Sequence, residues 1–149
     1  MYKGEITKGE DFYNLLFESD SFTSELGKVS LAAGKLEAEL ITFLKNNNVS
    51  ENVEKATLGK LIKICKDKKL SDKNLIAWLE IVLKQRNYLT HNIYALFINL
   101  IEETLLPKNI IDTDILTFTD KAFKLRVNLS DLAEMIKIEN NKILLGKVS

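Results

Sequence analysis

The fold of this chain is organised around LIAWLEIVL at residues 75–83, RNYLTHNIY at 86–94 and IYALFINLI at 93–101. The first and third segments are apolar on nearly every helical face, whereas the second is a polar island that holds the only histidine, His91. Leaving a buried polar group unpaired costs about 1–3 kcal/mol. The island must therefore be hydrogen-bonded internally or open onto a groove, and we look there for the function of the chain.

The island also lies where a long helical region has to break. Ser71 and Asp72 are suited to cap a helix that runs to Leu106, where Pro107 stops it. As one straight helix, this region would span about 54 Å. A compact domain of this size is only about 38 Å across. We therefore expect a kink or a helix–helix junction at the polar island.

Helical periodicity also dominates the rest of the chain. Residues 8–18 predict a short helix, and residues 21–46 predict a long amphipathic helix with an N-cap among Ser21, Thr23 and Ser24. Thr57 is the expected N-cap of a helix over 57–65. From residue 118 to 136, apolar side chains recur at steps of three and four. Either one unbroken helix covers this segment, or Ser130-Asp131 caps a separate last helix.

Composition supports one helical domain. The 149 residues include six glycines and one proline, few turn formers for a protein made of many strands. We predict a single all-α domain over 1–149, with a core of about 20–140, folded as a bundle of four to six helices. There is no apolar signal region and no candidate membrane span, so we expect a soluble, cytoplasmic protein with no membrane partner.

Charge and cysteine usage narrow the chemistry. The 21 basic and 21 acidic side chains balance, so any contact with nucleic acid depends on a local patch. The single cysteine, Cys65, excludes an intrachain disulfide and is interpreted as a packing residue rather than a nucleophile. No phosphate loop, nucleophile elbow or zinc spacing is present, and we expect no cofactor and no metal.

A cluster of lysines is the densest basic feature of the chain. It consists of Lys60, Lys63, Lys66, Lys68 and Lys69. Such a cluster is typical of a solvated helix face whose charges favour the C-terminal end of the helix dipole. The alternative is a patch that attracts phosphate groups.

Arg86 and His91 are the candidate catalytic residues. Arginine is a permanent, fork-shaped cation that binds phosphate oxygens in a bidentate manner. Histidine gives or takes a proton near neutral pH. Together they suit phosphodiester cleavage without a metal. Five residues of ideal helix leave the two side chains about 140° apart, so they converge only if the helix changes between them or if a partner chain contributes one.

The single histidine adds a second condition. In-line transesterification commonly uses one group as base and another as acid, and each chain offers one imidazole. A symmetric homodimer would place two histidines and two arginines at its axis. The alternative is that Arg86 and His91 belong to a buried hydrogen-bond network with no catalytic role.

The segment from Leu83 to Asn92 resembles HEPN domains (higher eukaryotes and prokaryotes nucleotide-binding), whose motif is R-x4-6-H. Asn87 matches the polar residue that commonly follows the arginine, and TLGKL at 57–61 is similar to a segment that often precedes the motif in bacterial members. The resemblance implies an all-α bundle that dimerises through the motif-bearing helices. It also implies a metal-independent ribonuclease of toxin–antitoxin or phage-defence systems, with Arg86 and His91 catalytic.

The resemblance also frames the residues around this pair. The candidates for binding or orienting the substrate are Asn87, Tyr88, Thr90, Tyr94, Lys60 and Lys63. In HEPN toxins paired with a nucleotidyltransferase antitoxin the motif continues as H-x-Y, whereas here Tyr94 comes one residue later, so we interpret it as a groove or packing residue. For Tyr88, stacking on an RNA base and packing at a dimer interface both stay open.

Three hypotheses follow. The first is a HEPN-type endoribonuclease with RNA as substrate and a cognate antitoxin or defence-complex protein as a further partner. The second is a non-catalytic HEPN-like dimer that binds RNA or a nucleotide, or has a regulatory role. The third is a helical partner subunit of a defence complex that uses the apolar face of residues 75–83 as its interface.

Overall fold

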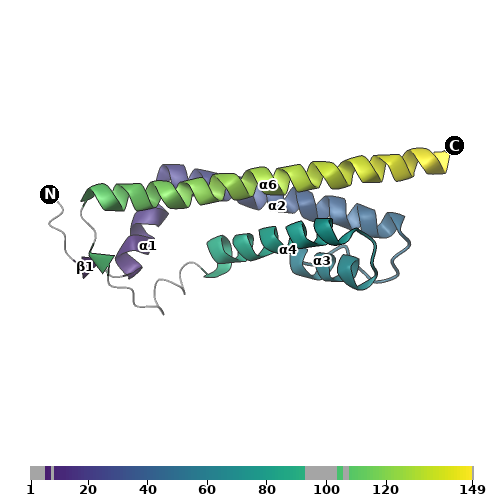
Figure 1. Ribbon diagram of the computed structural model, residues 1–149, viewed down its shortest axis with the longest axis horizontal. Helices are drawn as coiled ribbons and strands as arrows, with labels where there is room; N and C mark the ends of the chain where they lie inside the picture. Colours follow the sequence, from purple (N-terminus) through teal and green to yellow (C-terminus); the bar gives the residue numbers. More distant parts are fainter. Residues whose placement is uncertain (1–5, 8, 93–103, 106–107, 149) are drawn as a thin grey trace. The chain divides into compact units, whose positions relative to one another are not determined.

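The computed structural model describes residues 6–7, 9–92, 104–105 and 108–148, with side chains over 11–90 and 115–146. Within these residues helices dominate, and the strands are one pair of two residues each, so the all-α prediction is confirmed (Figure 1). The elements, in chain order, are β1 (Ile6–Thr7), α1 (Gly9–Glu18), α2 (Asp20–Asn46), α3 (Leu58–Asp67), α4 (Lys73–Asn87), the π-helix η1 (Tyr88–Asn92), β2 (Thr104–Leu105) and α6 (Lys108–Val148).

Helix α2 follows the predicted periodicity but begins at a different cap. The amide of Phe22 donates to the side-chain oxygen of Ser19 at 3.2 Å, so Ser19 caps the helix and none of the three side chains expected from the sequence does. At the other end Asn48 takes a left-handed backbone conformation, with φ of 59°. Asparagine tolerates this conformation well, which ends the helix at Asn46.

The caps predicted for α3 and α4 are confirmed. The amide of Lys60 donates to Thr57 Oγ1 at 3.3 Å, and the amide of Leu75 donates to Asp72 Oδ1 at 2.8 Å. Each side chain satisfies a backbone donor that has no partner inside its helix. Between the two helices Lys69 has a φ of 53°, which turns the chain back toward α4.

The second half of the chain departs from the sequence prediction at one point and resolves an alternative at another. The helical region does not extend to Leu106, because Thr104–Leu105 form β2 and pair antiparallel with β1, Leu105 opposite Ile6. A partner ninety-nine residues away cannot be read from local periodicity. Helix α6, in contrast, runs unbroken through Ser130-Asp131. Pro107 and the apolar segment 93–101 lie outside the described residues.

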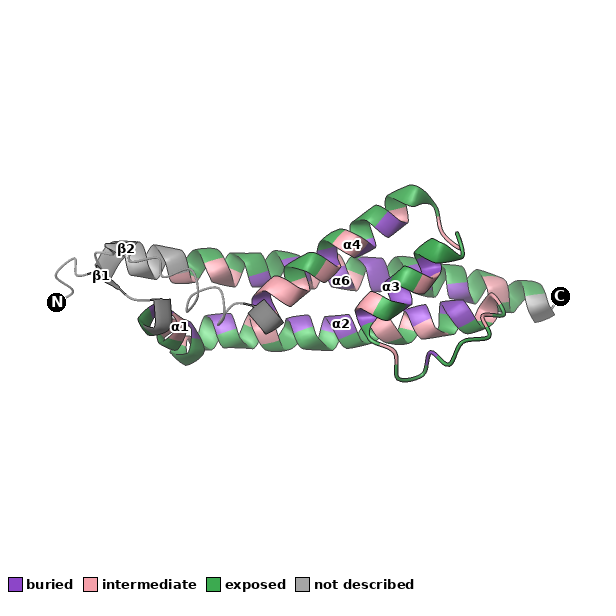
Figure 2. Ribbon diagram, turned by 90° about the horizontal axis from the view of Figure 1, so that it is seen from below, coloured by how far each residue is buried: buried purple, intermediate pink, exposed green. Residues whose placement is uncertain are grey.

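The chain packs as two compact units, the first formed by 1–29 with 85–125 and the second by 30–84 with 126–149. In the second unit, segments of α2, α3, α4 and α6 each turn an apolar stripe inward (Figure 2). Its fully buried side chains include Leu36, Leu40, Leu44, Leu58, Leu61, Leu79 and Leu129. The single-domain assignment over 1–149 stays a prediction.

The core of the first unit is aromatic. Phe118 of α6 packs on Phe12 of α1 with ring centroids 5.6 Å apart, and Phe22 of α2 meets it nearly edge-on at 6.5 Å. Phe12 and Phe22 are 6% and 4% exposed. Tilted and edge-to-face pairs are favourable arrangements for aromatic rings. This aromatic cluster includes Phe118, whose ring also contacts Lys121.

Candidate functional site

Helix α4 carries Arg86 on its inward-facing side. Its buried positions are Ile76, Leu79 and Val82, and the next buried residue along the chain is Leu89. These positions recur at helical spacing, and Arg86 falls on the same side between Val82 and Leu89. Its side chain is accordingly half-buried, with Nε inaccessible to solvent. Half-burial of a guanidinium at the end of a helix is the first unusual feature of the motif.

The second unusual feature of the motif is the π-helix η1. Helix α4 ends at Asn87, and η1 covers Tyr88–Asn92, so four of the five residues that follow Arg86 up to His91 are in a π-turn. In a π-helix the backbone bonds run from i to i+5 rather than from i to i+4, so each turn takes up more residues than the 3.6 of an α-helix and positions five apart come closer to one face. Regular α-helix therefore ends within the polar island, and the π-turn brings the backbone positions of Arg86 and His91 closer to one face. A kink or a helix–helix junction at the island stays a prediction, because residues 93–103 lie outside the described residues.

Thr90 makes a side-chain hydrogen bond across this turn. Its hydroxyl donates to the carbonyl of Arg86 at 2.7 Å. Because α4 ends at Asn87 and η1 begins at Tyr88, this hydrogen bond spans the junction between the α-helix and the π-turn. Thr90 thus has a structural role in the motif, in addition to the substrate contact that the sequence suggested.

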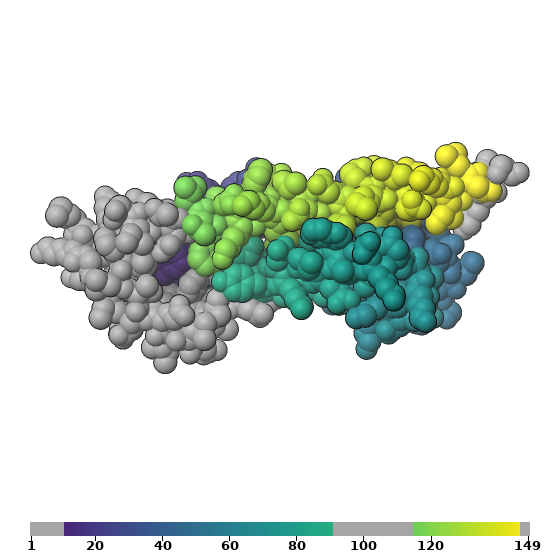
Figure 3. Space-filling model, viewed as in Figure 1, coloured from purple at the N-terminus to yellow at the C-terminus, as the bar shows by residue number. Residues whose placement is uncertain are grey.

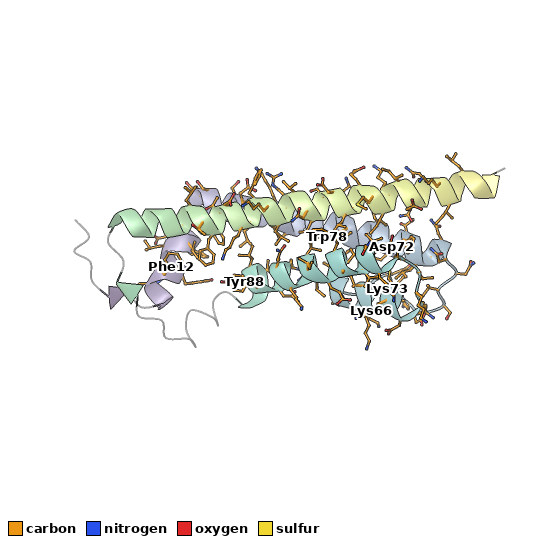
Figure 4. The ribbon with its side chains drawn as sticks, viewed as in Figure 1. Phe12, Lys66, Asp72, Lys73, Trp78 and Tyr88 are labelled. Atoms are coloured by element: carbon orange, nitrogen blue, oxygen red, sulfur yellow. The ribbon has the colours of Figure 1, made fainter. Side chains whose placement is uncertain are left out.

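Tyr88 contacts a residue that sequence reasoning missed. The ammonium of Lys121 lies 5.8 Å from the centroid of the Tyr88 ring and 5.0 Å from that of Phe118. Tyr88 itself lies at the C-terminal end of α4, where η1 begins (Figure 4). Lys121 follows Phe118 by three residues on α6, which places both on one helix face. That spacing is visible in the sequence, but nothing there shows that this face meets the motif.

The structure brings four of the predicted site residues together and places two others in the second unit. Arg86, Asn87, Tyr88 and Thr90 lie together at the end of α4 and in η1, all half-buried. His91 is in η1 by its backbone, and its side chain lies outside the described set; Tyr94 lies outside the described residues altogether. Lys60 and Lys63 are exposed on α3, in the second unit.

The lysine cluster on α3 is partly neutralised. Lys66 pairs with Glu80 at 3.1 Å, and Lys68 pairs with Glu51 at 3.1 Å. Hydrogen bonding to its own backbone and to the Lys68 ammonium holds the pKa of Glu51 below its ordinary value. The surfaces of α3 and α4, in teal, both face the viewer in Figure 3. This face carries fewer uncompensated positive charges than the sequence suggests, which favours the solvated-face interpretation for Lys66 and Lys68.

Two further features of the second unit offer less chemistry. A surface groove of about 480 Å³ between α2, α6 and the turn before α4 has apolar walls, including Leu40, Phe43 and Met135. Asp72 at its edge is occupied as the cap of α4, and Glu139 accepts from Lys142 at 3.3 Å. Cys65 is fully buried, as expected for a packing residue, and burial raises the pKa of its thiol to about 11.

The described part of the chain holds neither a cluster of metal ligands nor a helix that could span a membrane. Among the side chains described over 11–90 and 115–146, no three histidine, cysteine or acidic residues gather as metal ligands. Over 9–92 and 108–148 no helix has the length and apolar character that crossing a bilayer requires. No protein-family model, curated protein or solved structure matches this chain.

Proposed function

We propose that this protein is a metal-independent endoribonuclease of the HEPN type, with Arg86 and His91 as its catalytic residues. One observation carries the proposal: the α4 helix changes to a π-turn between these two residues. In a regular helix they would point about 140° apart, and the pair from one chain could not act on one phosphate. The wider turn brings their backbone positions closer to one face, which supports the proposal.

The reaction needs only the groups that the motif supplies. The ribose 2′-hydroxyl attacks the adjacent phosphorus, the P–O5′ bond breaks, and the products are a 2′,3′-cyclic phosphate and a 5′-hydroxyl. One imidazole accepts the 2′ proton and a second donates a proton to the leaving 5′ oxygen, so no water or metal is consumed. The guanidinium of Arg86 offsets the charge that builds on the phosphoryl oxygens.

The requirement for two imidazoles makes a homodimer part of the proposal. Each chain has one histidine, so the second comes from a second copy. Helix α4 offers an outward-facing apolar surface just before the motif, where Trp78 is 56% exposed and Ile81 is 43% exposed. Exposed tryptophan is typical of interface hot spots. Dimerisation through α4 would bring the two motifs together about a two-fold axis.

The test is cleavage of a mixed pool of structured and single-stranded RNA in the presence of EDTA. Wild type is expected to produce 2′,3′-cyclic phosphate ends, and His91→Ala to lose cleavage at least a hundredfold, in line with the loss of a general acid–base. Arg86→Lys keeps the charge but not the bidentate fork, so cleavage falls while the charge balance is unchanged. Lys142→Ala, which removes an ammonium already paired with Glu139, is the surface control.

A non-catalytic dimer that binds RNA or a nucleotide is the second candidate. The neutral net charge and the pairing of Lys66 and Lys68 with carboxylates favour it, since both lower the general attraction for RNA. It predicts that His91→Ala changes binding or stability while neither protein cleaves. A role as toxin or defence effector, with an antitoxin or a defence-complex subunit as partner, follows from the resemblance of the motif alone.

A further inference from the structure

Lys121 is an exposed cation held beside the motif by aromatic rings. Its ammonium lies 5.0 Å from the Phe118 centroid and 5.8 Å from the Tyr88 centroid, both within the range of cation–π attraction. Tyr88 follows Arg86 by two residues and precedes His91 by three. Through this ring, a residue of α6 is in direct contact with the motif.

The rings position the ammonium without neutralising it. Aromatic faces attract a cation through their quadrupole, but the lysine keeps its full positive charge. Among the side chains that the structure describes, no carboxylate lies within salt-bridge distance of Lys121, whereas Lys124 on the same helix pairs with Asp120 at 2.9 Å. An ammonium has three donors. Those turned away from the rings can bind an anion.

The aromatic rings under Lys121 belong to the packed core of the first unit. Phe118 is held by Phe12 at 5.6 Å and by Phe22 at 6.5 Å, and both of these rings are buried in the core of the first unit. A lysine on an open surface must give up side-chain freedom when it binds a phosphate. Lys121 has given up part of that freedom already, so less affinity is lost when a phosphate binds.

We propose that Lys121 binds a phosphate of the RNA strand that occupies the Arg86–His91 site, and that Tyr88 positions its ammonium. The inference rests on the proposed function for the identity of the anion. Lys121 would add a cation from α6, a helix distant in sequence from the motif, to Arg86 and His91. Tyr88 would be a positioning residue.

The test is binding of a fluorescein-labelled single-stranded 2′-O-methyl oligoribonucleotide to the full chain, followed by anisotropy over a series of salt concentrations. The 2′-O-methyl group blocks the attacking oxygen, so binding is measured without cleavage. Lys121→Met removes the ammonium and keeps an unbranched apolar side chain over the rings. Lys124→Met is the matched control, because it removes an ammonium that Asp120 already compensates on the same helix.

The expected result for Lys121→Met is a loss of affinity of about tenfold, as for one charge-assisted hydrogen bond. The slope of log K against log salt concentration also falls by about 0.7, the value for one phosphate contact with a single strand. Lys124→Met keeps the wild-type slope, and Lys121→Arg restores it because a cation is retained. Thermal midpoints within about 2 °C of wild type exclude a purely structural effect.

The outcomes separate this inference from the proposed function. If wild type cleaves RNA but Lys121→Met binds with unchanged affinity and slope, the inference fails and the nuclease stands. If the loss is specific to Lys121 and no RNA is ever cleaved, the RNA contact stands and the nuclease fails. An absence of any RNA binding by wild type overturns the inference outright.

Discussion

The hydroxyl of Thr90 should stabilise the protein more than an equivalent hydroxyl in a regular helix. Thr90 donates to the Arg86 carbonyl at 2.7 Å, and Thr119 makes the same contact with the Ile115 carbonyl at 2.8 Å in α6. The Ile115 carbonyl lies within an unbroken helix, where the backbone amide four residues on already donates to it. The Arg86 carbonyl lies at the junction of α4 and η1, where the backbone pattern changes from i→i+4 to i→i+5.

The magnitudes follow from this difference. Thr90→Val removes a half-buried hydrogen bond across the junction of α4 and η1 and should lower the free energy of unfolding by about 1–1.5 kcal/mol. Thr119→Val removes a second, redundant donor and should cost less than about 0.5 kcal/mol. With a urea m-value of about 2 kcal/mol/M, the Thr90 variant unfolds at about 0.5–0.8 M less urea than wild type.

The assay is urea unfolding followed by far-UV circular dichroism, with RNA cleavage measured on the same samples. Thr90→Ser keeps a hydroxyl and should recover most of the lost stability. If the π-turn aligns Arg86 and His91, Thr90→Val also slows cleavage by native protein well below its midpoint, whereas Thr119→Val does not. Equal midpoints for the Thr90 and Thr119 variants would refute the reasoning, because the two hydroxyls would then be equivalent.

Three further predictions test other parts of the structure. The Cys65 thiol, whose pKa burial raises from 9.0 to about 11, should react with a disulfide reagent at pH 8 only after unfolding in urea. The thiol of the unfolded chain loses its proton at lower pH than the buried thiol, so the free energy of unfolding should fall as pH rises from about 9 to about 11. If the difference in unfolding free energy between wild type and Cys65→Ala does not change over this pH range, the prediction is wrong. Trp78 is the only tryptophan, so its emission should shift to shorter wavelength as protein concentration drives dimerisation, and Ile81→Lys should abolish both shift and dimer in light scattering; a dimer with unshifted emission would place the interface elsewhere. Leu61→Ala, at a fully buried position, should cost about 2–5 kcal/mol by urea unfolding, while Leu31→Ala, at a position 77% exposed, should cost almost nothing.

Features set by local chemistry were predictable from the sequence. The Thr57 and Asp72 caps and the break after Asn87 depend on residues a few positions apart, and all three are present. The cap of α2 was misplaced at Ser21, Thr23 or Ser24, because several serine and threonine side chains are near the start of the helix and only the observed amide contact selects Ser19. Periodicity predicts that a helix exists better than it predicts where the helix begins.

The sequence by itself determined that the chain is helical, that its longest apolar region is interrupted at Arg86–Asn92, and that Arg86 and His91 are the residues suited to phosphate chemistry. These properties follow from side-chain chemistry and from the 3.6-residue period, which act over a few residues. Only the tertiary structure decided that the break is a π-turn, that Thr104–Leu105 pair with Ile6–Thr7, and that Lys121 lies over Tyr88. Each of the last two joins residues more than thirty positions apart, and such contacts depend on how the elements pack.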